Sequence, residues 1–91
     1  MSRPNWLPAV CAHFGWDPES WEREPTECWT RRGEPADGEA TISVYDSEWV
    51  HWDLGGVTMS SDVCGDVLTT LLALQAAVAA LEAVHAARVK S

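Results

Sequence analysis

Basic residues are scarce in this sequence. Six Lys and Arg stand against 14 Asp and Glu, which gives a formal net charge of −8 at pH 7. A surface with so few cations cannot neutralise a run of phosphates or the head groups of anionic lipids. We therefore expect no direct binding of nucleic acid and no docking on an anionic membrane.

The chain also has little that is typical of an export signal or a membrane anchor. Pro4, Pro8 and His13 interrupt the first 16 residues, which lack the basic and apolar regions of a signal peptide. The longest apolar stretch, Val67 to Val89, is rich in alanine and carries Thr, Gln, Glu, His and Arg. We expect this stretch to be too weakly hydrophobic to cross a membrane, and the protein to be cytoplasmic.

Motifs that carry metal or catalytic chemistry are missing as well. The three cysteines, Cys11, Cys28 and Cys64, are odd in number and widely spaced, and no CxxC pair occurs. We expect them to be free, buried thiols in a reducing compartment. There is no P-loop, GxGxxG or HExxH, and no nucleophile motif accompanies His51. We predict no catalytic residues, no metal and no cofactor, with a small thiol or metal-binding protein as an alternative.

Tryptophan, in contrast, is abundant, with six residues beside one Tyr and one Phe. With 91 residues and a hydrophobic content of 46%, the chain is long enough for one small domain over residues 1–91 and too short for two. The patterns below predict an α+β fold: a short N-terminal helical segment, a small antiparallel β-meander, and a long C-terminal helix packed on one face of the sheet.

The N-terminal segment has the pattern of a short helix capped by Asn5 and ended by Gly15. One face carries apolar residues at helical spacing: Leu7, Val10, Cys11 and Phe14. A second helical segment is expected over 17–25, because Asp17 and Pro18 form an N-cap followed by proline. Four tryptophans are expected to attach this N-terminal half to the rest of the domain: Trp6, Trp16, Trp21 and Trp29.

The middle of the chain has the alternation and turn residues of a β-meander. Three strands are predicted over 27–32, 40–45 and 49–54, with 57–59 as an optional fourth. A two-residue loop at 46–47 would place the aliphatic residues of the two central strands on opposite faces. A three-residue loop at 46–48 places them on one face, so burial favours it. The predicted pairs are then Val44 with Val50, Ile42 with Trp52, and Ala40 with Leu54, and Trp52 belongs to the core.

The C-terminal third predicts a long helix from about Asp62 to about Val89, capped by Ser60 or Ser61. At ~1.5 Å per residue such a helix is about 40 Å long, which three short strands cannot cover. One interpretation is that its apolar stripe packs on the sheet of the same chain. The other is that its C-terminal half pairs with a second copy. The predicted dimer seam consists of Leu71, Leu74, Val78, Leu81 and His85.

The polar face of the central hairpin is a candidate protein-binding surface. The three-residue loop directs Tyr45, Trp49 and His51 away from the aliphatic face, with Tyr45 and Trp49 as cross-strand neighbours. Aromatic residues are enriched where proteins bind one another. The alternative is that the N-terminal segment covers this face.

Acidic residues are concentrated in the segment 17–48, which holds ten carboxylates and three arginines, a net charge of 3 − 10 = −7. Such a surface can mimic nucleic acid and occupy a DNA-binding protein, or it can simply keep a tryptophan-rich protein soluble. The sequence thus favours a small acidic, non-enzymatic interaction or regulatory module that is homodimeric. One hypothesis is that a phage or mobile element encodes it to bind a host protein. A DNA-mimic inhibitor acting through residues 17–48 is the alternative.

Overall fold

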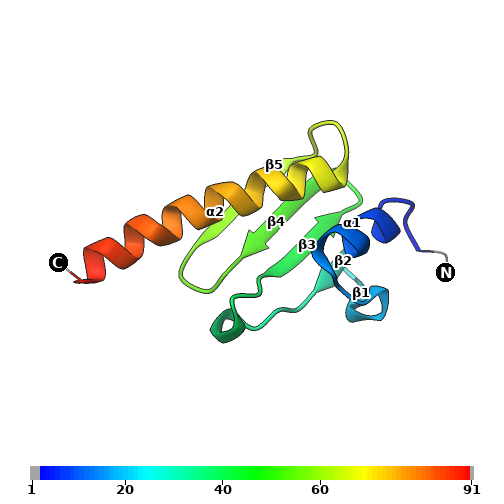
Figure 1. The fold of residues 1–91 in the computed structure, drawn as a ribbon. Coiled ribbons are helices and arrows are strands. Elements are labelled where there is room, and N and C mark those ends of the chain that lie inside the picture. The colour runs from blue at the N-terminus through cyan, green and yellow to red at the C-terminus, as the bar shows by residue number, and fades with distance from the viewer. Residues whose placement is uncertain (1–2, 91) are drawn as a thin grey trace.

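The structure, a computed structural model, describes residues 3–90 of the chain, with side chains to residue 88. It confirms the α+β class: two helices pack on one antiparallel sheet (Figure 1). In chain order the elements are α1 (Leu7–Phe14), the 3-10 turn η1 (Pro18–Ser20), β1 (Trp21–Glu24), β2 (Cys28–Arg31), the 3-10 turn η2 (Pro35–Asp37), β3 (Thr41–Tyr45), β4 (Trp49–Asp53), β5 (Thr58–Asp62) and α2 (Val67–Lys90).

The sheet is a meander of five strands in the order β1-β2-β3-β4-β5, with each strand antiparallel to the next. The prediction of three or four strands is therefore wrong. The missed strand, β1, lies inside the segment that was expected to be helical over 17–25. There the helical part is one turn, in which Asp17 accepts a hydrogen bond from the backbone of Glu19, and Trp21 then pairs with Arg31 of β2. Pairing with the next strand in a hairpin overrides the local helical preference of this charged segment.

Helix α1 follows the predicted pattern with one correction at its start. Trp6, not Asn5, occupies the N-cap position, and its side chain makes no capping hydrogen bond. Leu7, Val10 and Cys11 are buried as predicted. Gly15 ends the helix with a φ of 73°, and its backbone N–H donates to the carbonyl of Cys11. A left-handed φ of this kind favours glycine, because it has no Cβ.

The predicted register of the central hairpin is confirmed. Val44 pairs with Val50 and Ile42 with Trp52 across β3 and β4, and the connecting loop is 46–48. Glu48 in that loop has a φ of 64°. The third predicted pair, Ala40 with Leu54, lies just beyond the ends of both strands. Trp52 is 5% exposed and belongs to the core, also as predicted.

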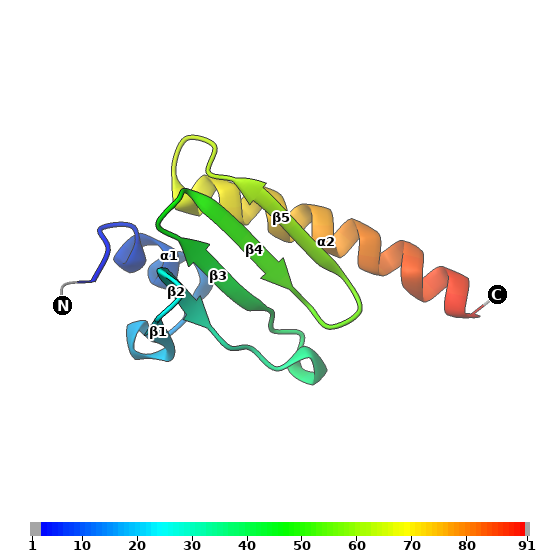
Figure 2. The ribbon, with the colours of Figure 1, turned by 180° about the vertical axis from the view of Figure 1, so that it is seen from behind.

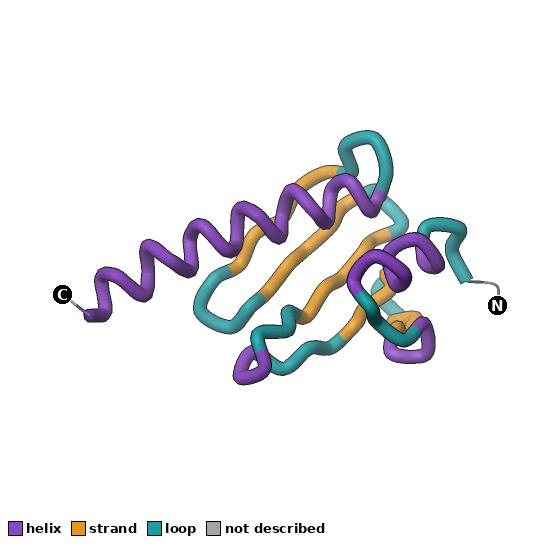
Figure 3. Tube along the Cα trace, viewed as in Figure 1, coloured by secondary structure: helices purple, strands orange, loops and turns teal. Residues whose placement is uncertain are grey.

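Both helices lie on the same face of the sheet, and the other face is open (Figures 1 and 2). The tube view shows the same two layers, one of helices and one of strands (Figure 3). The most completely buried side chains come from both layers: Leu7, Val10, Ile42, Val50, Leu71 and Val78. The core therefore lies between the sheet and the two helices, as expected when each element buries one apolar face.

Helix α2 begins at Val67, later than the predicted start at Asp62. Asp62 belongs instead to β5, where it lies opposite Trp49, and the sheet continues to the next residue, because the Val63 N–H donates to the Glu48 carbonyl. The cap is Asp66, whose Oδ1 accepts a hydrogen bond from the backbone N–H of Thr69 at 2.7 Å. Hydrogen bonds from the backbone and the side chain of Thr69 lower the pKa of Asp66 from its ordinary value.

The length of α2 exceeds what the sheet covers. Leu71, Leu74 and Val78 are buried, whereas every residue from 79 to 88 is exposed. The C-terminal half of the helix therefore projects beyond the sheet (Figure 1). The expectation that the sheet is too short to cover this helix is confirmed, although the sheet has five strands and not the three or four that were predicted.

The composition of α2 does not exclude a membrane span, contrary to expectation. Within Val67–Arg88 an 18-residue window has a mean hydropathy of 1.9, enough to span a bilayer by length and composition alone. The same helix nevertheless supplies Leu71, Leu74 and Val78 to the core of the domain. A helix that completes a folded core can have the same composition, but only 28% of this window is buried, because the C-terminal half of α2 lies beyond the sheet.

Candidate functional site

The open face of the sheet presents the predicted aromatic and histidine side chains. Tyr45 pairs with Trp49, and Ser43 pairs with His51, on the side of the sheet that faces away from the helices. Trp49 is 39% exposed, while Tyr45 and His51 are half-buried. The alternative that the N-terminal segment covers this face is wrong, because α1 buries its apolar residues on the opposite face, in the core (Figure 2).

Hydrogen bonds link small side chains that lie next to Tyr45 on this face. The Thr30 hydroxyl lies 3.1 Å from the Ser43 hydroxyl and 3.4 Å from the Cys28 sulfur. Cys28 and Thr30 are buried although they lie on the outer side of β2. Tyr45 therefore lies beside buried, hydrogen-bonded side chains of β2. Trp49 also pairs with Asp62 of β5, so a carboxylate borders the aromatic pair.

The predicted helix seam divides into two parts. Leu71, Leu74 and Val78 are buried against the chain's own sheet and α1, whereas Leu81 is 45% exposed and His85 is also on the surface. Val84, which was not among the predicted residues, is 51% exposed. Its position three residues after Leu81 is the signal that could have identified it, since residues three apart share a helix face.

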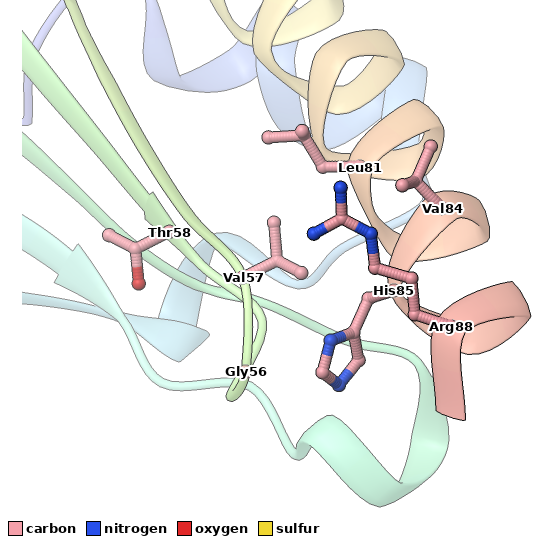
Figure 4. A pocket seen from close by; sticks show the side chains of 7 residues that line it. All are labelled: Gly56, Val57, Thr58, Leu81, Val84, His85 and Arg88. Atoms are coloured by element: carbon pink, nitrogen blue, oxygen red, sulfur yellow. The ribbon is translucent and has the colours of Figure 1, made fainter.

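The projecting part of α2 borders a hollow of about 380 Å³ (Figure 4). Gly56 and Val57 line it from the turn before β5, Thr58 lines it from the start of β5, and the helix contributes Leu81, Val84, His85 and Arg88. Leu81, His85 and Arg88 extend from the helix toward the turn in this view. The hollow is open and combines apolar groups with nitrogen donors, which suits contact with another protein surface more than enclosure of a small molecule.

The acidic segment 17–48 carries fewer uncompensated charges than its composition suggests. Its three arginines each pair with a carboxylate of the same segment: Arg23 with Asp46, Arg31 with Glu39, and Arg32 with Glu24. The first pair is bidentate, at 2.7 and 2.6 Å, and the guanidinium lowers the pKa of the Asp46 carboxyl. Arg3 pairs with a fourth carboxylate, Glu19. Four of the ten carboxylates therefore have cationic partners.

An aromatic cluster joins the N-terminal half to the sheet. Trp6 meets Trp21 edge to face at 5.2 Å, and Phe14 stacks on Trp16 at 4.4 Å between ring centroids. The buried guanidinium of Arg31 lies 4.3 Å from the Trp16 ring centroid. Most of the tryptophans therefore pack within the domain, and Trp49, at 39%, is the most exposed of the six.

The cysteines differ in their surroundings. Cys11 and Cys28 are buried free thiols, as predicted, whereas Cys64 is exposed because it lies in the loop between β5 and α2. Burial raises the pKa of the Cys11 thiol, and the nearby Trp21 indole and Arg31 guanidinium only partly oppose this. Among the described residues, no three His, Cys, Asp or Glu side chains gather into a group that could hold a metal ion.

Comparisons of the chain with protein-family models, with curated proteins and with solved structures give no match. The proposals below therefore depend on the geometry of the described residues.

Proposed function

We propose that this protein is a small homodimeric interaction module without catalytic activity, which associates with itself through α2. The observation that carries this proposal is the projecting half of the helix, in which residues 79–88 are all exposed and include Leu81 and Val84. Leucine and valine side chains left in water forgo the stabilisation that their burial would give. A second copy of the chain packed against α2 would bury part of this surface.

The oligomeric state tests this proposal directly. Sedimentation equilibrium at micromolar concentration is expected to give twice the monomer mass of 10.0 kDa. A monomeric mass at every concentration tested would contradict the proposal.

The open sheet face supports a second surface, for a protein partner. An exposed Trp49 beside Tyr45, on a face that neither helix covers, has the aromatic character of binding hot spots. We expect Trp49→Ala and Tyr45→Ala to release a partner captured from lysate, and Thr58→Ala, near the other end of the same face, to retain it. Retention of the same partners by both aromatic variants would exclude this face.

The salt dependence of partner binding distinguishes the DNA-mimic alternative. A partner that normally binds DNA and is held by the segment 17–48 would be released steeply as salt rises, because each ion pair formed is screened. A partner held by the aromatic face would show a shallow dependence, since burial of apolar area is insensitive to screening.

A further inference from the structure

The two edges of the sheet differ in chemistry. The β1 edge carries Glu22, Arg23 and Glu24 and is followed by Pro25, and charge and proline are the devices that keep edge strands from pairing with other chains. Strand β5, at the other edge, begins Thr-Met-Ser-Ser and has one charged residue, Asp62, at its end. No strand lies beyond β5 in the described part of the chain. The β5 edge therefore lacks the protection that the β1 edge has.

The hydrogen-bond pattern shows which backbone groups of β5 face this edge. The Val63 N–H donates to the Glu48 carbonyl at 2.8 Å, and the Leu54 N–H donates to the Val57 carbonyl at 2.9 Å. Hydrogen-bonded pairs alternate along an antiparallel ladder, so the groups of every second residue from 57 to 63 are directed toward β4. Those of Thr58, Ser60 and Asp62 are directed outward.

An apolar hollow of about 350 Å³ runs beside the same edge. Met59, Ser60 and Ser61 line it from β5, and the helix contributes Thr69, Ala73 and Ala77 among others. These helix side chains are small, so another helix can approach closely here. The β5 edge therefore presents an unpaired strand and, beside it, a helix face with small side chains, and both are accessible to a partner.

The distribution of charge indicates which partner binds at the β5 edge. The segments 54–61 and 67–81 contain no charged residue, in a chain in which 22% of the residues are charged. Two copies that each carry a charge of −8 repel one another at most surfaces. At this edge they can meet without placing like charges opposite each other, and its neutrality gives no attraction to a charged partner.

We propose that β5 pairs antiparallel with β5 of a second copy, so that the two sheets join and the small side of each α2 packs against the other. A two-fold axis brings identical strands together antiparallel. Within one chain, residues 59–61 of β5 lie beside 69–77 of α2, and residues 56–58 lie beside 81–88, so α2 runs antiparallel to β5. Because the two-fold axis makes the two β5 strands antiparallel, the two α2 helices also meet antiparallel. This inference rests on the proposed self-association and identifies the surface that forms it.

Two pairs of variants test the edge by sedimentation equilibrium. Ser60→Pro removes an outward N–H that the chain's own ladder does not use, and Ser60→Ala is its control. Ala73→Arg places a long side chain in the hollow, and Gln75→Arg places the same side chain 200° around the helix, at ~100° per residue. We expect Ser60→Pro and Ala73→Arg each to raise the dimer dissociation constant roughly tenfold or more, and the controls to leave it within about twofold.

The two arginine variants separate packing from charge. Both reduce the net negative charge by one, which by itself favours association of acidic copies. If Ala73→Arg weakens the dimer and Gln75→Arg does not, the arginine side chain at position 73 occupies space that the second copy needs. Ala73 is exposed, so this variant remains informative if the proline variant fails to fold. A wild-type dimer that both Ser60→Pro and Ala73→Arg preserve would overturn the edge pairing and leave self-association through another face of α2. A wild-type monomer would overturn the proposed function as well.

Discussion

Trp49 and Trp52 lie three residues apart on β4 and have opposite environments. Trp49 is 39% exposed on the open face, and Trp52 is 5% exposed in the core. Because side chains alternate along a strand, an odd separation places them on different faces. A single strand thus supplies one tryptophan to the core and one to the candidate binding surface.

This difference predicts unequal effects of alanine substitution. We expect Trp52→Ala to lower the free energy of unfolding by about 3–5 kcal/mol, as removal of a buried aromatic residue does. Trp49→Ala is expected to cost about 1 kcal/mol or less, mainly through loss of its cross-strand contact with Tyr45. Urea unfolding followed by far-UV circular dichroism measures both. Equal losses would mean that Trp49 has a structural role in the domain.

Asp66 connects the stability of α2 to pH. Its pKa is lowered in the folded protein from the ordinary value of 3.8, by hydrogen bonds with Thr69. A lowered folded-state pKa stabilises the fold above the unfolded-state value, and this stabilisation is lost as pH falls through the folded-state pKa. We expect Asp66→Ala to lower the melting temperature at neutral pH and to have little effect below the folded-state pKa.

Thermal melts of wild type and variant between acid and neutral pH measure this convergence. Asp66→Asn, whose side-chain oxygen can still accept the hydrogen bond, is the matched control and is expected to lose less at neutral pH. A difference between wild type and Asp66→Ala that persists unchanged at acid pH would contradict the role given to the carboxylate.

At the scale of elements, the end of α1 depends on one glycine. A Cβ at Gly15 would meet no atom within 4 Å, so the cost of Gly15→Ala comes from its φ of 73° alone. We expect a loss of about 1–2 kcal/mol in the free energy of unfolding, the cost of a left-handed conformation for alanine. Gly56→Ala is the control, because it has the same open space without a left-handed φ. Chemical denaturation compares them, and equal effects would refute the backbone explanation.

Elements with a clear periodic pattern of their own were predictable, and those that depend on pairing with another strand were not. The apolar spacing of α1 and the register of β3 and β4 follow from periodicity and burial within a few residues. Strand β1 lies within a charged segment with helical preference, and it forms because β2 lies beside it. The start of α2 shifted to Val67 for the same reason, since pairing with β4 extends β5 to Asp62.

At the scale of the whole molecule, charge and apolar surface are separated. The acidic segment 17–48 forms β1 to β3 and their loops, whereas the uncharged segments 54–61 and 67–81 form β5 and most of α2. One side of the domain therefore repels its own copies and the other side can accept one. This separation is the basis for placing self-association at the β5 edge and a different partner on the open face.

The sequence by itself determined the fold class, the faces of the central hairpin and the outward direction of Tyr45, Trp49 and His51. These follow from periods of 2 and 3.6 residues, which are local properties of the chain. Only the tertiary structure decided how the apolar stripe of α2 is used. Leu74 and Leu81 occupy equivalent positions in that stripe, yet one is 4% exposed and the other 45%. The difference arises because the sheet ends between them, and the position of α2 over the sheet is set by packing between residues that are far apart in the sequence.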